Sequence, residues 1–178
     1  MCRKCKANTV FVLINGRKLC KKCFCKYFEK KIFYTIRKYN FLKKYGSIFI
    51  EKAKYSEILK YIFRTSVYKI KKNKQVNKIL LSTSADDIAI EIILNQLSTK
   101  KEIKELLPKQ KNKIKPFYLL LDKEILLYAK LKGLKINKEK EKDELTKKVR
   151  TFINDLEKKH PEIKYAVVNG FLQILPAL

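Results

Sequence analysis

KILLSTSADDIAIEIILNQL, residues 78–97, predicts a short strand followed directly by a helix. KILLS (78–82) is an apolar run of strand length, and residues 85–97 are apolar on most sides, as in a buried helix. Upstream, SIFI (47–50) predicts another buried strand and residues 55–63 a helix. Strands that alternate with helices indicate an α/β layer built on a parallel sheet.

Further elements extend this pattern toward the C-terminus. Asp122 is expected to cap the helix KEILLYAKLKG, and Gly133 to close it. His160-Pro161 separates the last two helices. The remaining predicted elements are a basic helix over 66–77, a short helix over 100–107, a third strand or extended segment over 116–121, an amphipathic helix over 139–159 and a last helix over 162–174.

All five cysteines lie within the first 25 residues. Four of them form C-x2-C-x14-C-x2-C, one residue short of the usual inner spacing of such zinc sites. Each C-x-x-C pair presents two thiolates to one tetrahedral ion, and Asn15-Gly16, a preferred hairpin turn, brings the pairs together. The pattern predicts a zinc ribbon whose ligands are Cys2, Cys5, Cys20 and Cys23.

The spacing leaves two alternatives open, an iron–sulfur cluster on the same four ligands and incidental buried thiols. In an intracellular protein such cysteines favour a metal over disulfides. Cys25 breaks the pattern and is predicted to be a spectator. Because four thiolates close a tetrahedral site, no position is left for a substrate, and the zinc is expected to be structural.

Positive charge is concentrated in the N-terminal part of the chain. Of the formal net charge of +26, residues 1–74 contribute +19 and residues 75–178 contribute +7. This asymmetry favours a nucleic acid as partner, because counterion release from a phosphate backbone drives binding. A solvated basic surface is the alternative, and charge does not distinguish RNA from DNA. On the basic helix predicted after the ribbon, the candidate RNA-binding residues are Lys22, Lys26, Lys30, Lys31, Arg37 and Lys38.

The adjacent Asp86 and Asp87 suggest either catalysis or a helix start. Ser84-x-x-Asp87 resembles a capping box before an apolar run, and a helix dipole favours carboxylates in its first turn. His160, the sole histidine, is predicted to be a turn residue, so a His-rich metal site or a Ser–His–Asp triad has no support. With no apolar signal or membrane-spanning segment, the protein is expected to be soluble and cytoplasmic.

Four segments, in chain order, resemble the tRNA 2-thiolation proteins, which are PP-loop ATPases that replace a uridine oxygen with sulfur. After the cysteine ribbon comes FEKKIFYTIRKYNFLKKYG (28–46). The other three resemble the family's GHN-x-DD-x-AQ, I-K-P-L-x-x-x-x-E-x-E-x-x-x-Y-A and V-R-x-F-L-x-x-L-E-x-x-H-P-G-I-K-F motifs. They are STSADDIAIEIILNQL (82–97), KPFYLLLDKEILLYAKLKG (115–133) and VRTFINDLEKKHPEIKYAVVNGF (149–171).

The family's nucleotide-binding motif, S-G-G-K-D-S, is degraded in this sequence. The corresponding turn reads EKAKYS (51–56), which retains Lys54 and Ser56 but lacks both glycines and the aspartate. In active relatives the helix start with Asp86 and Asp87 faces the nucleotide site, so the resemblance implies that Lys54, Ser56, Asp86 and Asp87 are remnants of that site. Those glycines let backbone N–H groups close on phosphate, so ATP binding in the family manner is not expected. No cysteine follows Cys25 to carry sulfur or hold a further cluster, and the chain is shorter than the family norm.

The resemblance implies a shortened, degenerate member of the family and not an enzyme. The expected domains are a zinc ribbon (1–26), a basic connecting helix (27–45) and a degenerate PP-loop-like α/β domain with C-terminal helices (46–178). The implied function is that of a non-catalytic subunit of a tRNA thiolation complex, which binds tRNA, an active thiolation subunit or a second copy of itself. A stand-alone zinc-ribbon RNA-binding protein and an active tRNA sulfurtransferase are the alternatives.

Overall fold

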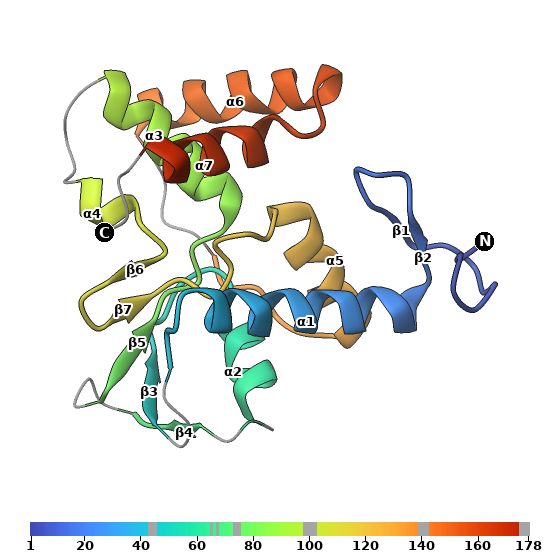
Figure 1. The fold of residues 1–178 in the computed structure, drawn as a ribbon, viewed down its shortest axis with the longest axis horizontal. Helices are drawn as coiled ribbons and strands as arrows, with labels where there is room; N and C mark the ends of the chain where they lie inside the picture. Colours follow the sequence, from blue (N-terminus) through green and yellow to red (C-terminus); the bar gives the residue numbers. More distant parts are fainter. Residues whose placement is uncertain are drawn as a thin grey trace.

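A hairpin and a long helix form the N-terminal part of the protein. In the computed structural model, which describes residues 1–42, 46–64, 66, 68–72, 76–97, 103–138 and 143–174, β1 (Phe11–Val12) pairs antiparallel with β2 (Lys18–Leu19). Gly16 lies in their connection with φ of 75°, a left-handed conformation that favours glycine. The helix α1 (Lys21–Lys38) follows, and the hairpin projects beyond its first turn, away from the main sheet (Figure 1).

The central sheet has five strands in the order β4-β3-β5-β7-β6. The first four pair in parallel and only β6 runs antiparallel to its neighbour. Their bounds are β3 (Ser47–Ile50), β4 (Lys69–Ile70), β5 (Lys78–Leu80), β6 (Lys109–Gln110) and β7 (Lys113–Ile114). The α/β class, with a parallel-rich sheet and a cysteine cluster near the N-terminus, is therefore confirmed.

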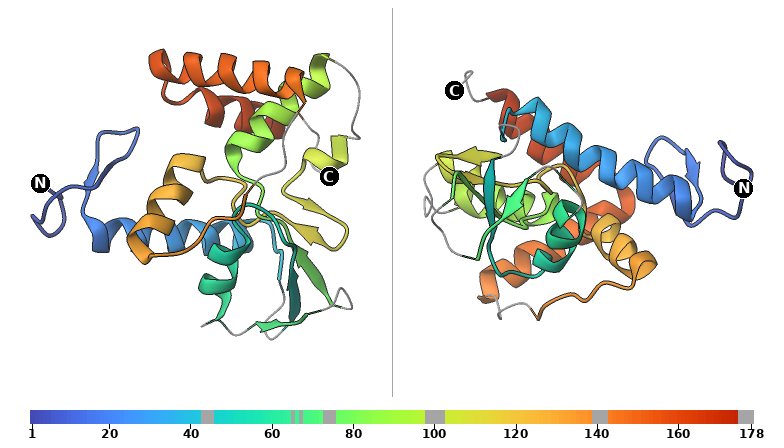
Figure 2. Two further views of the ribbon diagram at one scale, coloured as in Figure 1. Left: turned by 180° about the vertical axis from the view of Figure 1, so that it is seen from behind. Right: turned by 90° about the horizontal axis from the view of Figure 1, so that it is seen from below.

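Six further helices pack as two groups, which the views in Figures 1 and 2 separate. Near α1 and the sheet, Phe28 stacks on Tyr128 at 4.2 Å between ring centroids, within a core that includes residues of β3, β5, α2 and α5. A second core joins α3, α6 and α7 around Ile88, Ile153 and Val168. The helices are α2 (Ser56–Arg64), α3 (Ala85–Leu97), α4 (Ile103–Leu106), α5 (Asp122–Lys132), α6 (Glu144–Lys159) and α7 (Ile163–Ile174).

Three predicted elements were wrong. Within 66–77, the described residues include the edge strand β4 instead of a helix, while 67 and 73–75 lie outside the described residues. Residues 116–121 form a buried turn after β7 and not a strand, because their apolar side chains fill the core without pairing. Asp122 is the first residue of α5, and Leu121 occupies its N-cap position.

The connecting helix expected over 27–45 begins earlier, at Lys21, and ends at Lys38, whereas the remaining predicted helix boundaries agree closely with the structure. Gly133 closes α5 in the left-handed conformation, as expected. Asp143 caps α6 by accepting a hydrogen bond from the backbone N–H of Thr146. Residues 43–45, 100–102 and 139–142, at the ends of predicted helices, lie outside the described residues. In the described part of the chain, no helix is long and apolar enough to cross a membrane.

Candidate metal centre and nucleic-acid interface

The four predicted ligand thiols form one compact cluster. The Sγ atoms of Cys2, Cys5, Cys20 and Cys23 all lie within 4.8 Å of one another. Cys5 Sγ is 3.2 Å from Cys20 Sγ and 3.8 Å from Cys23 Sγ. Thiolates about 2.3 Å from a central zinc ion would stand about 3.8 Å apart in a tetrahedron. These residues therefore fit a single tetrahedral metal ion, which would hold the hairpin onto the start of α1.

The backbone around the cluster already favours thiolate at two of the four positions. Hydrogen bonds from the backbone of Cys20, and then of Cys5 and Lys4, lower the pKa of Cys2 to about 6. A backbone hydrogen bond from Cys23 is likewise the largest cause of a lowered pKa at Cys20. Cys25 lies outside the four-thiol group, and burial raises its pKa. The geometry thus separates four candidate ligands from one core thiol, as the spacing predicts.

The carboxyl ends of β3, β5 and β7 meet at one edge of the sheet. From this edge the chain leaves β3 toward β4 on one side and leaves β5 toward β7 on the other. Such a point of divergence is where open α/β sheets bind ligands. The loop 51–55, the start of α3 and the start of α5 all border it, and they place Lys54, Ser56, Asp86, Asp87 and Asp122 in one region.

In the loop that corresponds to the family's nucleotide-binding motif, the protein's own side chains pack against the turn. Tyr55 is fully buried, with its ring edge-on to Phe117 at 6.4 Å between centroids. Burial, and then the Asp122 carboxylate, raise the pKa of Tyr55. Lys54 Nζ lies 3.2 Å from Asp122 Oδ2 and 4.8 Å from the centre of the Tyr55 ring.

Asn137 fastens the same loop from the other side. Its backbone N–H donates to the carbonyl of Lys54 at 3.0 Å. Its side-chain amide donates to the carbonyl of Ala53 at 2.7 Å and to the buried hydroxyl of Ser56 at 3.0 Å. The loop is therefore held by three hydrogen bonds from one residue, and the Ser56 hydroxyl already has a protein partner.

Asp86 and Asp87 have separate structural roles. Asp87 Oδ2 accepts hydrogen bonds from the Ser84 backbone N–H at 3.4 Å and from Ser84 Oγ at 3.1 Å. Ser84 Oγ in turn accepts from the Asp87 backbone N–H at 3.2 Å, which confirms the predicted capping box. Asp86 Oδ2 accepts from the backbone N–H of Asp122 at 2.7 Å and so caps α5 rather than its own helix. Arg150 Nη2 donates to Asp87 Oδ1 at 2.8 Å, linking α6 to this edge.

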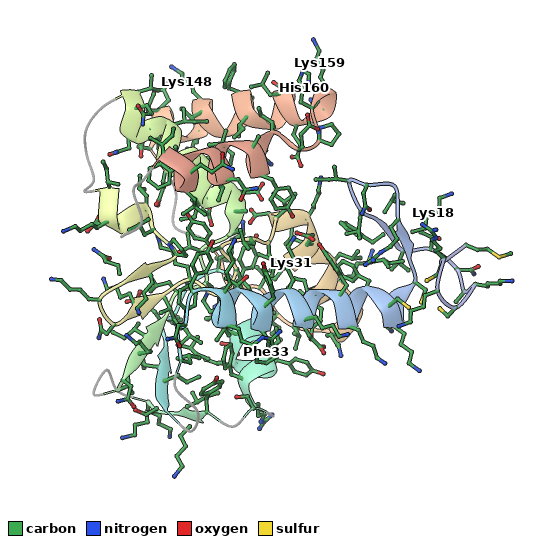
Figure 3. All side chains as sticks on the ribbon, viewed as in Figure 1. Lys18, Lys31, Phe33, Lys148, Lys159 and His160 are labelled. Atoms are coloured by element: carbon green, nitrogen blue, oxygen red, sulfur yellow. The ribbon has the colours of Figure 1, made fainter. Side chains whose placement is uncertain are left out.

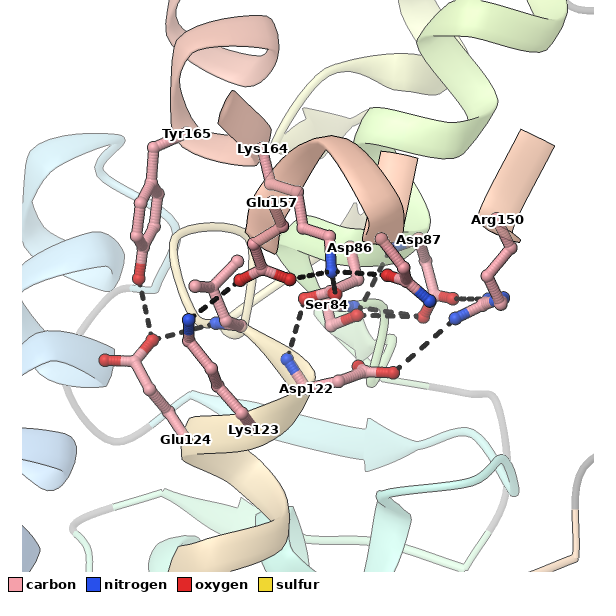
Figure 4. Close-up of polar contacts among 12 residues, drawn as sticks. Ser84, Asp86, Asp87, Asp122, Lys123, Glu124, Arg150, Glu157, Lys164 and Tyr165 are labelled. Carbon is pink, nitrogen blue, oxygen red and sulfur yellow. Dashed lines mark hydrogen bonds and ion pairs between the residues drawn. The ribbon is translucent and has the colours of Figure 1, made fainter. Parts of the chain in front are cut away.

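Lys164 is the buried centre of a second group of polar side chains, the polar cluster at the carboxyl edge of the sheet (Figure 4). Its side chain is only 4% exposed, and its Nζ donates to Asp86, to Glu157 at 2.6 Å and to Asn154 at 2.8 Å. Burial alone would lower the pKa of Lys164, but the Asp86 and Glu157 carboxylates outweigh it and raise that pKa. The ammonium therefore stays charged and joins α3, α6 and α7.

A second, very different polar region lies between the hairpin and α1. It is a groove of about 730 Å³, and we call it the cationic groove. No Asp or Glu is among the described residues that line it. The lining residues are Arg3, Lys4, Arg17, Lys18, Leu19, Cys23, Lys26, Tyr27, Lys30, Lys31 and Tyr34.

The six predicted RNA-binding residues divide between this groove and other surfaces. Lys26 and Lys30 are exposed in its wall, whereas Lys22, Arg37 and Lys38 are exposed outside its lining. Lys31 is 17% exposed and points inward, with its Nζ 3.2 Å from Glu124 and 2.8 Å from the hydroxyl of Tyr165. Burial lowers the pKa of Lys31, partly offset by Glu124.

Sequence reasoning did not identify the four cations that the segment before α1 contributes to the groove. Arg3 and Lys4 lie inside the first C-x-x-C pair, and Arg17 and Lys18 follow the Asn15-Gly16 turn. Basic residues at these two places were a usable signal, because the predicted ribbon carries both to the start of the basic helix. Tyr34 gave no comparable signal.

No model of a known protein family matches the sequence, and no curated protein matches it. Among solved structures, the U34-tRNA thiolase NcsA from Methanococcus maripaludis, with its [4Fe-4S] cluster, is similar with a TM-score of 0.80. The match covers 97% of this chain and 86% of the thiolase chain, at 18% sequence identity. The chain has the fold of a tRNA thiolase.

The polar cluster gives a structural role to the segments that resemble thiolation motifs. Asp86 and Asp87 stand in 82–97, Glu124 in 115–133, and Arg150 and Lys164 in 149–171. Glu124 accepts from the backbone N–H of Leu121 at 2.8 Å, while Tyr165 donates to the same carboxylate at 2.7 Å. All five charged residues thus hold helix starts or join helices (Figure 4). These motifs serve the fold, whether or not the protein catalyses a reaction.

Proposed function

We propose that this chain is a non-catalytic relative of the tRNA thiolases, a cytoplasmic pseudoenzyme that binds tRNA beside an active thiolation subunit or a second copy of itself. The observation that carries the proposal is the occupied loop after β3. Tyr55 fills the turn expected to take phosphate, and Lys54, which phosphate would meet, faces Asp122 at 3.2 Å. A nucleotide would have to displace both side chains and separate this ion pair.

Cysteine usage supports the same conclusion. Sulfur transfer requires a reactive thiolate or a cluster near the nucleotide. The sequence has no cysteine after Cys25, and four of its five cysteines form the compact group in the ribbon. A thiolate committed to a closed tetrahedral site is not available as a nucleophile.

We propose zinc as the metal of this group. A [4Fe-4S] cluster interposes irons and sulfides between its cysteines and spreads their thiolates further than a single ion does. The four Sγ atoms lie within 4.8 Å of one another, which favours one tetrahedral ion with closed coordination. When bound, zinc would supply no chemistry beyond fastening the hairpin to α1.

The tRNA partner is supported by the cationic groove and the fold. The groove collects cations from two elements with no acidic residue among its described lining, and it lies in the part of the chain that carries +19 of the net charge. The most direct physical use of such a surface is to replace the counterions of a phosphate backbone.

Two binding measurements on the full metal-loaded chain test the proposal. Titration calorimetry with ATP and Mg²⁺ should give no binding heat, and fluorescence anisotropy should show tRNA binding that weakens steeply with salt. Saturable ATP binding would overturn the non-catalytic assignment and favour an active sulfurtransferase. Equal affinity for tRNA and unrelated RNA would favour a stand-alone RNA-binding protein.

The loop itself provides a sharper version of the ATP measurement. A variant with Lys52→Gly, Ala53→Gly and Tyr55→Asp restores the glycines and the acidic residue of the resembled motif. If Tyr55 excludes the nucleotide, this variant should gain ATP affinity over the parent chain. If the parent chain binds ATP and the variant binds it no more tightly, the proposed role of Tyr55 would be contradicted.

A further inference from the structure

The cationic groove contains one exposed aromatic residue that electrostatics does not explain. Tyr34 lies on α1 and lines the groove, with 51% of its surface exposed. Leaving half of an aromatic side chain in water forgoes the burial that stabilises such residues elsewhere in this protein. Lys26 and Lys30 stand on the same helix face, two turns and one turn before it. The groove therefore offers cations and an open ring side by side.

The floor of the groove is fixed before any ligand arrives. Tyr27 donates its hydroxyl to Glu124 Oε1 at 3.1 Å, and Lys31 lies over the Tyr165 ring at 4.8 Å from its centroid. Lys31 also pairs with Glu124, so its charge is already compensated. These contacts join α1 to α5 and α7 and leave Tyr27 and Lys31 as a rigid surface. The ligand-binding cations are then the exposed ones, on α1 and on the hairpin.

A groove with both exposed cations and an exposed aromatic ring suits unpaired RNA better than duplex RNA. A duplex keeps its bases stacked on one another and presents phosphates and hydroxyls, so it could use the cations but not Tyr34. An unpaired nucleotide can use both, because every base has a face that stacks on an aromatic ring. The groove volume of about 730 Å³ falls in the range of sites that enclose small ligands and is ample for one nucleotide.

We propose that the cationic groove binds an unpaired stretch of RNA, with a base stacked on Tyr34 and the flanking phosphates held by Lys26 and Lys30 of α1 together with Arg3 of the first C-x-x-C pair and Arg17 of the hairpin. This inference rests on the proposed function and narrows it, since it names single-stranded segments, such as a loop or an end, as the part of the RNA that is recognised. Arg3 and Arg17, which are half of the proposed phosphate contacts, lie in the segment that the four cysteines hold together, so the site depends on the metal that these cysteines would bind.

The test compares single-stranded and duplex RNA on matched variants. Fluorescence anisotropy would use a labelled single-stranded RNA decamer and the same decamer annealed to its complement as a blunt-ended duplex, which has no unpaired loop. Tyr34→Ala should weaken decamer binding roughly 5- to 150-fold and leave duplex binding nearly unchanged, because a stacked base contributes on the order of 1–3 kcal/mol. Tyr34→Phe should retain decamer affinity, since it keeps the ring. Phe152→Ala, which removes a 59% exposed aromatic residue from α6, is the matched control and should change neither.

The phosphate contacts have their own control. Lys26→Ala with Lys30→Ala should weaken binding of both RNAs and reduce the salt dependence, whereas Lys148→Ala with Lys159→Ala should not. Figure 3 shows both of these lysines on α6, outside the groove lining, with Lys148 at the end of α6 farther from Lys18 on the hairpin. Tighter binding of the duplex, or equal losses on both RNAs from Tyr34→Ala, would overturn the inference. If tRNA still binds in that case, the proposed function stands without it; if no RNA binds, both fail.

Discussion

The cationic groove and the carboxyl edge of the sheet both gather positive charge, but they differ in what faces it. At the edge, Lys54, Arg150 and Lys164 each lie within 3.2 Å of a carboxylate. In the groove, no acidic residue is among the described lining. The edge uses its cations to join helices, whereas we propose that the groove presents its exposed cations to RNA; the inward-facing Lys31 is the exception, because it pairs with Glu124. A count of lysines and arginines cannot separate these two uses, whereas the position of the carboxylates does.

Metal removal should produce the largest effect, because it tests whether the groove exists without the ribbon. Cys20→Ser should abolish metal binding and unfold the hairpin, since apparent binding energies of structural zinc reach about 10–16 kcal/mol. The zinc content, measured by elemental mass spectrometry, should fall from one zinc per chain in the parent to none in the variant. The affinity for RNA should fall with it.

Cys25→Ser is the matched control for that experiment. Cys25 lies five positions from Cys20 but outside the four-thiol group, so zinc content should stay at one per chain. Loss of the metal in this variant would show that the ligand set is wrong. Iron in place of zinc in the parent protein would contradict the proposed metal and leave the ligand set intact.

Removal of Lys164 should have the next largest effect, on the free energy of unfolding, and it tests whether the cations at the sheet edge stabilise the fold. Lys164→Met leaves the buried Asp86 carboxylate without its cation, and breaking a buried ion pair in this way costs about 3–5 kcal/mol; Glu157 is only partly buried and keeps Lys123. The free energy of unfolding, measured by urea denaturation, should fall by that amount.

An exposed groove lysine provides the contrast on the same scale. Lys26→Ala should change the free energy of unfolding by no more than about 0.5 kcal/mol, as surface substitutions usually do. If Lys164→Met is equally mild, the edge cluster is not a structural centre. The distinction between the two regions would then be lost.

The ribbon and the α3 unit could be predicted from local sequence, because their determinants lie close together in the chain. The four cysteines, the Asn15-Gly16 turn and the Ser84–Asp87 capping box each need only neighbouring residues. The turn at 116–121 could not be predicted in this way. Its apolar residues are buried by tertiary packing, and an apolar run by itself does not distinguish a strand from a buried turn.

The site was predicted less completely, because its geometry depends on distant partners. Lys31 looked like its exposed neighbours Lys26 and Lys30, but Glu124, 93 positions away, turns it inward. The predicted role of Lys54 and Asp86 as remnants of a nucleotide site did not foresee their ion pairs with Asp122 and Lys164. Long-range pairs of this kind leave no periodic signal in one sequence.

The pH dependence of stability should show a smaller effect at the edge. Burial alone would raise the pKa of Glu157, but Lys123 and Lys164 outweigh it and hold that pKa below its usual 4.5. A carboxyl group with a lowered pKa stabilises the folded state fully above pH 4.5 and loses that contribution as the pH falls below it. Urea denaturation between pH 6 and 3 should therefore show a steeper loss for the parent protein than for Glu157→Gln. Parallel curves would mean that Glu157 does not stay charged in the folded state as this cluster requires.

Removal of the α3 cap should give the smallest effect and shows whether Asp86 and Asp87 really act apart. Ser84→Ala removes only the hydroxyl that accepts from the Asp87 backbone N–H, so it should cost about 1 kcal/mol, as caps usually do. Asp87→Ala should cost more, because Arg150 then loses its 2.8 Å partner as well. Combined with Lys164→Met, the Ser84→Ala cost should add almost independently, since the hydroxyl contacts Asp87 and the ammonium contacts Asp86. Strong coupling between them would instead mean that the two carboxylates work as one unit, as a catalytic or metal-binding pair would.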